Sequence, residues 1–81
     1  KMKKITLIAG SLIFPVPSGT YLVLETIENV FVFSEKDDHT KFPDVANSKI
    51  KLLALRCPYE GKGYTTWQFL EDSDRIIEPK Q

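Results

Sequence analysis

His39 is the only histidine in the chain, and it lies beside Asp37, Asp38 and Lys41, residue types that can form a metal site or an acid–base pair. A metal site needs three or four converging ligands, and this stretch offers one imidazole and adjacent carboxylates. We therefore expect His39 to belong to a solvated loop, and we expect neither a metal site nor a cofactor.

Cys57 is the only cysteine, and it lies between Arg56 and Pro58. A neighbouring cation can lower the pKa of a thiol, but a catalytic cysteine also needs a positioned base, for which His39 is the sole imidazole. The preferred interpretation is a buried, unreactive cysteine at the end of a strand, because a free cysteine packs as a small apolar residue. A single cysteine excludes an intramolecular disulfide and favours a reducing compartment.

Two short motifs have residue types used in catalysis. The acidic run Glu71-Asp72-Ser73-Asp74 could supply paired carboxylates, but adjacency in sequence does not place two carboxylates across a cleft. Asp and Ser side chains readily bond their own backbone, so this run predicts a turn. Gly61-Lys62-Gly63 contains part of a phosphate-binding loop, but the complete pattern is absent, and Lys62 is expected at a hairpin tip. These motifs favour a protein that is not an enzyme.

The aromatic residues near the C-terminus are the best candidates for binding. Alternation along a strand places Trp67 and Phe69 on one face and Tyr64 on the other. Core packing is the preferred interpretation of Trp67 and Phe69, because a small β-domain needs large apolar residues. However, Tyr and Trp also dominate protein interfaces and stack on nucleic-acid bases. We therefore name four binding candidates, Tyr59, Lys62, Tyr64 and Trp67.

The length and charge of the chain narrow the classes of function. With 81 residues the chain has room for one domain, residues 1–81. Lys and Arg total 11, as do Asp and Glu, so the formal net charge is zero. Non-specific nucleic-acid binders usually carry a positive excess, because they neutralise phosphates. Balanced charge therefore disfavours a nucleic-acid partner.

The N-terminal segment has two interpretations. Basic residues precede the mostly apolar run 5–14, and a possible cleavage site ending in the small residue Ser18 follows it. Signal peptides have this pattern. We prefer a first strand at Ile5–Ala9 and a cytoplasmic location. Export is the alternative, if residues 2–18 act as a signal peptide. No run approaches the about 20 apolar residues that a membrane-spanning helix needs.

The strongest structural pattern is the run Tyr21–Phe33, in which β-branched and aromatic residues are interrupted by Glu28-Asn29. It predicts a β-hairpin, with Thr20–Glu25 and Val30–Ser34 paired antiparallel. A helical stripe also fits part of this run, but the density of β-branched and aromatic residues favours strands.

The second half of the chain predicts further strands. Tyr64–Leu70 reads as a strand, and a Gly-rich turn precedes it. Lys49–Cys57 fits either a strand or a helix near residues 43–56, and a second hairpin is the simpler picture. Arg75–Ile77 predicts a short final strand. The fold class is therefore all-β or β-rich α+β: a small barrel or sandwich of five to six short, mainly antiparallel strands, with one short helix as the alternative for residues 43–56.

These features predict a non-enzymatic protein-binding module, or a small accessory or inhibitory factor, that acts through a β-surface or a sheet edge. The alternative is a single-stranded nucleic-acid-binding barrel that uses Tyr64, Trp67 and Lys62. Self-association as a symmetric dimer is also expected, because Tyr21–Phe33 is apolar on both faces and contains no Lys or Pro to guard an edge. The competing explanation is that these strands lie centrally and are covered by a helix from Pro43 to Arg56.

Overall fold

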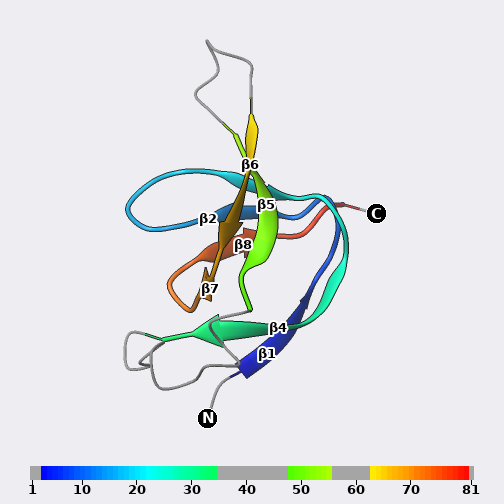
Figure 1. Cartoon of the computed structure of the whole chain (residues 1–81), viewed down its shortest axis with the longest axis vertical. Helices are drawn as coiled ribbons and strands as arrows, with labels where there is room; N and C mark the ends of the chain where they lie inside the picture. Colours follow the sequence, from blue (N-terminus) through cyan, green and yellow to red (C-terminus); the bar gives the residue numbers. More distant parts are fainter. Residues whose placement is uncertain (1–2, 35–47, 56–62, 81) are drawn as a thin grey trace.

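The computed structural model describes residues 3–34, 48–55 and 63–80. Within these residues the chain forms eight strands and no helix, arranged in two sheets (Figure 1). The large sheet has five strands in the order β6-β5-β3-β2-β8, and the small sheet has three strands in the order β1-β4-β7. The strands are β1 (Lys3–Leu7), β2 (Leu12–Phe14), β3 (Tyr21–Val23), β4 (Ile27–Phe33), β5 (Ile50–Ala54), β6 (Tyr64–Gln68), β7 (Leu70–Glu71) and β8 (Arg75–Ile77).

The all-β alternative of the predicted fold class is confirmed for the described residues. The pairing is mainly antiparallel, since only β4 and β7 run parallel among the described strands. The two sheets do not close into a barrel within this part of the chain, so the barrel alternative is wrong there. Two open sheets around a shared core correspond to the sandwich alternative.

The first predicted hairpin is wrong. β3 pairs antiparallel with β2 and β5 in the large sheet, whereas β4 pairs antiparallel with β1 and parallel with β7 in the small sheet. The segments Thr20–Glu25 and Val30–Ser34 therefore belong to different sheets. Both β3 and β4 are central strands, so the predicted unguarded edge between Tyr21 and Phe33 is not an edge.

The hairpin prediction depended on a turn at Glu28-Asn29. In the structure these two residues form a β-bulge in β4. Between the pairs Ile5↔Val30 and Leu7↔Ile27, β4 carries two residues and β1 carries one. Asn29 has a φ of 57°, in the left-handed region that asparagine tolerates better than most residues. The same preference makes asparagine typical of tight hairpin turns, so one residue type predicts both structures.

The second predicted hairpin is confirmed. β5 and β6 pair antiparallel from Ile50↔Gln68 to Ala54↔Tyr64. The helix alternative is therefore wrong for Ile50–Ala54, which form β5 beside β3 and do not cover it. Residues 43–47 and 56 of that alternative lie outside the described residues. The predicted first and last strands are present as β1 and β8.

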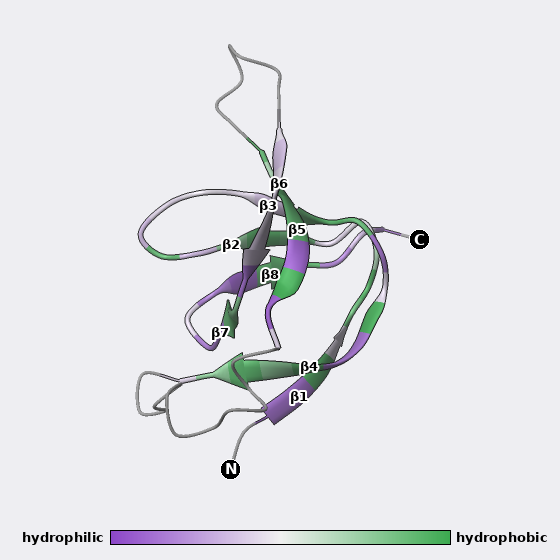
Figure 2. Ribbon diagram, viewed as in Figure 1, coloured by the Kyte–Doolittle hydropathy of each residue, from purple (hydrophilic) through white to green (hydrophobic). Residues whose placement is uncertain are grey.

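One hydrophobic core lies between the sheets. The small sheet contributes Leu7, Val30 and Leu70, and the large sheet contributes Ile13, Val23, Ile50 and Leu52, all of them buried. Figure 2 shows that apolar residues recur along strands of both sheets. Burying a side chain of this kind contributes about 1.5–3 kcal/mol, so this shared core is the main source of stability.

One continuous segment, Tyr64–Glu71, joins the two sheets. Its first part, β6, pairs with β5 in the large sheet, and its last part, β7, pairs with β4 in the small sheet. The change of partner occurs at Phe69, whose ring lies edge-on to that of buried Phe33, with 5.0 Å between the ring centroids. The ring contact therefore lies at the point where the chain passes from the large sheet to the small one.

The bulge at Asn29 can be tested by substitution. Asn29→Val should lower the free energy of unfolding by about 1–2 kcal/mol, because a β-branched residue is strained at positive φ. Asn29→Gly should change it little, since glycine adopts this conformation freely. Urea denaturation measures both, with Glu28→Val as the matched control on an exposed neighbour. Equal losses for Asn29→Val and Glu28→Val would contradict the bulge.

Candidate functional site

The outer face of the large sheet carries a row of aligned side chains. Because directly paired residues project to the same side of a sheet, the pairings of β6, β5, β3, β2 and β8 define rows that cross all the strands. The inner rows belong to the core described above. One outer row, called the outer row below, consists of Thr65, Leu53, Leu22, Leu12 and Ile77. At the usual spacing between strands it is about 19 Å long.

The outer row is mostly aliphatic although it faces away from the core. Ile77 is exposed, and Leu12, Leu22 and Leu53 are half-buried. Leu24 and Leu55 extend this surface past the ends of β3 and β5, and both are exposed. A sheet with one buried face normally alternates apolar residues inside with polar residues outside. A contiguous apolar surface on the outside is therefore a feature typical of interaction sites.

Trp67 lies next to this row on β6 and is the most accessible aromatic side chain on the face. Its exposed fraction is 59%. It pairs with Lys51 on β5, and it follows Thr65 by two residues on the same side of β6. Core packing of Trp67 is therefore wrong. Phe69 is half-buried, and its ring lies edge-on to that of Phe33 outside the core cluster. The two residues differ because the chain leaves the large sheet between them.

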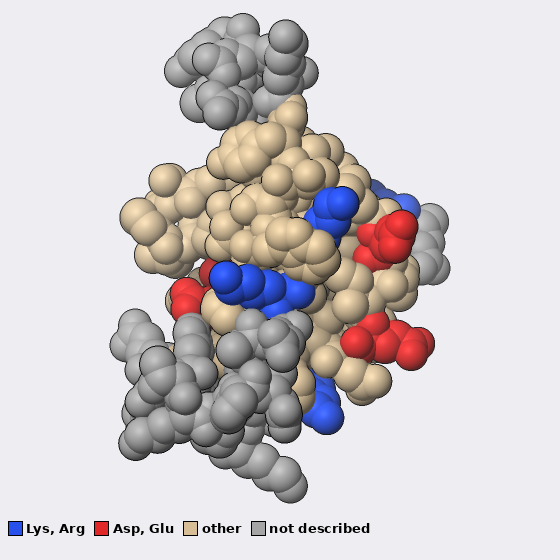
Figure 3. Space-filling model, viewed as in Figure 1, with Lys and Arg blue, Asp and Glu red and all other residues tan. Residues whose placement is uncertain are grey.

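The charged residues of the outer face are all basic. Lys51 lies on β5, and Arg75 lies on β8 opposite Phe14. Lys49 precedes β5 and lines a pocket with Glu28 and Phe31 of β4 in the small sheet. The Arg75 guanidinium carbon is 5.2 Å from the centroid of the Phe14 ring, and the Lys49 Nζ is 5.3 Å from that of Phe69. In Figure 3 the surface over β5 and β6 is mainly uncharged and its few charged groups are Lys or Arg.

The four binding candidates named from the sequence are not all on this face. Tyr64 is half-exposed, but it pairs with Ala54 on the side of β6 opposite to Trp67. Tyr59 and Lys62 lie outside the described residues, as do His39 and Cys57. The aliphatic members of the outer row were not found from the sequence, because they come from separate strands.

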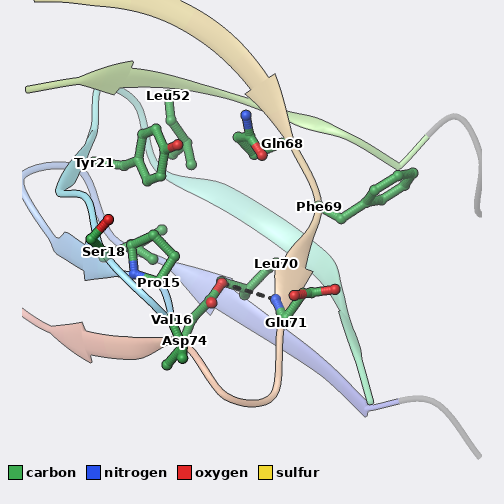
Figure 4. A pocket seen from close by; sticks show the side chains of 11 residues that line it. Pro15, Val16, Ser18, Tyr21, Leu52, Gln68, Phe69, Leu70, Glu71 and Asp74 are labelled. Atoms are coloured by element: carbon green, nitrogen blue, oxygen red, sulfur yellow. Dashed lines mark hydrogen bonds between the residues drawn. The ribbon is translucent and has the colours of Figure 1, made fainter. Parts of the chain in front are cut away.

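A cleft of about 310 Å³ lies on the inner side, between the loop after β2 and the turn before β8 (Figure 4). Its lining includes buried Leu52 and Leu70, the hydroxyls of Ser18 and Tyr21, the Gln68 amide, and the carboxylates of Glu71 and Asp74. Among the described lining residues there is no histidine, cysteine or lysine that could pair with these groups as a base or nucleophile. Among the described residues, no three His, Cys, Asp or Glu side chains gather as a metal site.

The turn predicted at Glu71-Asp72-Ser73-Asp74 is confirmed. The Asp74 carboxylate accepts a hydrogen bond of 3.0 Å from the Glu71 backbone N–H, and the Asp74 backbone N–H donates one of 3.0 Å to the Glu71 carbonyl. The Asp74 carboxylate thus closes the turn, as Asp side chains commonly do. Its position at the rim of the cleft is explained by this structural role.

The exposure of Trp67 predicts a small effect on stability. Trp67→Ala should change the free energy of unfolding by less than about 1 kcal/mol, as is usual for surface substitutions. The matched core variant Leu52→Ala should lower it by about 2–5 kcal/mol. Because Trp67 is the only tryptophan, acrylamide should also quench the fluorescence of the folded protein efficiently. A large loss of stability in Trp67→Ala, or protection from quenching, would contradict the exposed position.

Comparisons with known proteins return no relative. The chain matches no family model, no curated protein and no solved structure. In the part of the chain that the structure describes, no helix is long and apolar enough to cross a membrane. The apolar outer face around Trp67 is therefore the feature on which a functional interpretation rests.

Proposed function

We propose that this protein is a non-enzymatic binding domain that docks another protein on the outer face of its large sheet. The observation that carries the proposal is the outer row together with Trp67, which is 59% exposed at the end of that face. Tryptophan is among the residue types that contribute most to binding energy when a partner desolvates them. The protein would act as a small accessory or inhibitory factor, and its single cysteine supports a reducing, cytoplasmic setting.

A protein partner fits this face better than a single-stranded nucleic acid. The surface beside Trp67 is aliphatic, whereas nucleic-acid grooves combine many cations with aromatic side chains that stack on successive bases. Tyr64 and Trp67, the two described aromatic candidates, project from opposite sides of β6 and do not form one stacking platform. Both observations favour a protein surface as the occupant.

A second copy of the chain fits the face less well than a different protein. In a two-fold dimer the same surface faces itself, so Lys51 and Arg75 of one copy would approach the same basic face of the other. Like charges across an interface are unfavourable. The dimer expected from the sequence also depended on edges at β3 and β4, which are central strands.

Affinity capture with matched variants tests the proposal. Wild-type protein, Trp67→Ala and Tyr64→Ala are used as bait on extract from the native source, and any protein retained is purified and titrated by calorimetry. Trp67→Ala should weaken its binding at least about tenfold, the effect of losing an interface hot spot. Tyr64→Ala should bind as the wild type does, because that aromatic ring lies on the opposite side of β6.

Equal binding of the purified partner to all three proteins would rule out the outer face as its docking surface. Light scattering coupled to size exclusion supplies a second readout. If the wild type is a dimer and Trp67→Ala is a monomer, the outer face binds a second copy of this chain and not a different protein.

A further inference from the structure

We propose that the segment bound by the outer face is acidic, with carboxylates flanking an apolar stretch about 20 Å long. This inference rests on the proposed function, because it names the chemistry of the partner at the same surface. It is carried by the sign of the charges on the outer face and by the positions of two cations on opposite sides of the outer row.

The charges of the domain are segregated, although they balance overall. The formal net charge is zero, with 11 basic and 11 acidic residues. On the outer face of the large sheet, both charged residues at described strand positions are basic, namely Lys51 and Arg75. The described acidic residues nearest the large sheet lie in the connections, such as Glu25 after β3 and Asp72 and Asp74 before β8. The outer face is therefore positively charged because of where the basic residues lie, and not because the domain has an excess of them.

The basic residues lie on both sides of the outer row. Arg75 projects from the row that contains Phe14, on one side, and Lys51 projects from the row that contains Trp67, on the other. Three strand spacings separate β8 from β5 in the sheet order. With the usual spacing of strands and residues, the two cations are about 20 Å apart on a diagonal across the apolar surface. A helix of about 13 residues spans that distance.

Arg75 is held on the face by an aromatic ring, because its guanidinium carbon lies 5.2 Å from the centroid of the Phe14 ring. Lys51 and Arg75 are both exposed. Both cations can therefore meet a partner carboxylate at the rim of the apolar surface. Pairing at the rim of an apolar surface steers association and sets specificity, while the apolar contacts supply most of the affinity.

A displayed library of random 15-residue peptides tests this inference without assuming a sequence. The library is selected on the wild type, on Trp67→Ala, on the double variant Lys51→Glu/Arg75→Glu, and on Lys3→Glu. The last variant is the control for charge alone, because Lys3 is exposed on β1 in the small sheet. Enriched peptides are synthesised and titrated against each protein, with oligothymidylate as the nucleic-acid probe.

The wild type and Lys3→Glu should enrich peptides in which Asp or Glu flank aliphatic or aromatic residues. Those peptides should bind Lys51→Glu/Arg75→Glu at least about tenfold more weakly, and added salt should weaken their binding to the wild type. The double variant should instead enrich basic peptides. These results would support the acidic segment.

Peptides that bind the outer face without an acidic excess would overturn the charge inference and leave the proposed function standing, provided Trp67→Ala weakens them. Peptides that bind Trp67→Ala and the wild type equally would overturn both, as would the absence of any enrichment on the wild type. Tighter binding of oligothymidylate than of any enriched peptide would replace a protein partner with a single-stranded nucleic acid.

Discussion

The large sheet can bury only one of its faces against the small sheet, and most of the structure follows from this constraint. The inner face supplies Ile13, Val23 and Leu52 to a core that the small sheet completes with Leu7 and Val30. The small sheet therefore does not cover the apolar side chains of the outer face. Its aliphatic row would be unusual on a sheet whose outer side meets only water. The same constraint that stabilises the domain thus creates its candidate docking surface.

The segment Tyr64–Glu71 shows how the two sheets and the candidate site are connected. Trp67 lies on β6 at the edge of the large sheet, and three residues later Leu70 is buried in the small sheet. Phe69, between them, packs against Phe33. An exposed aromatic side chain and a buried core side chain therefore lie three residues apart in one short run.

Local patterns in the sequence predicted where the strands lie, but not always which strands pair with each other. The second hairpin was predictable because only a short Gly-rich stretch of sequence separates the two runs that pair, so that local sequence also indicates the pairing. The first was not, because Asn29 at positive φ is common to turns and bulges, and the true partner of β4 is distant β1. The alternation of side chains along the strand placed Trp67 and Tyr64 on opposite faces. It did not indicate which face is buried, because that depends on which face of β5 meets the core. The outer row could not be predicted either, because it depends on which strands pair and on which face of the sheet is buried.

The pairing of Leu12 with Ile77 brings together residues that are far apart in the sequence. Contacts between residues so far apart form slowly, because a long loop must be closed before they stabilise anything. The outer row is complete only when β8 has joined β2. A partly folded chain in which β8 is still unpaired therefore carries only four of the five residues of the outer row in place.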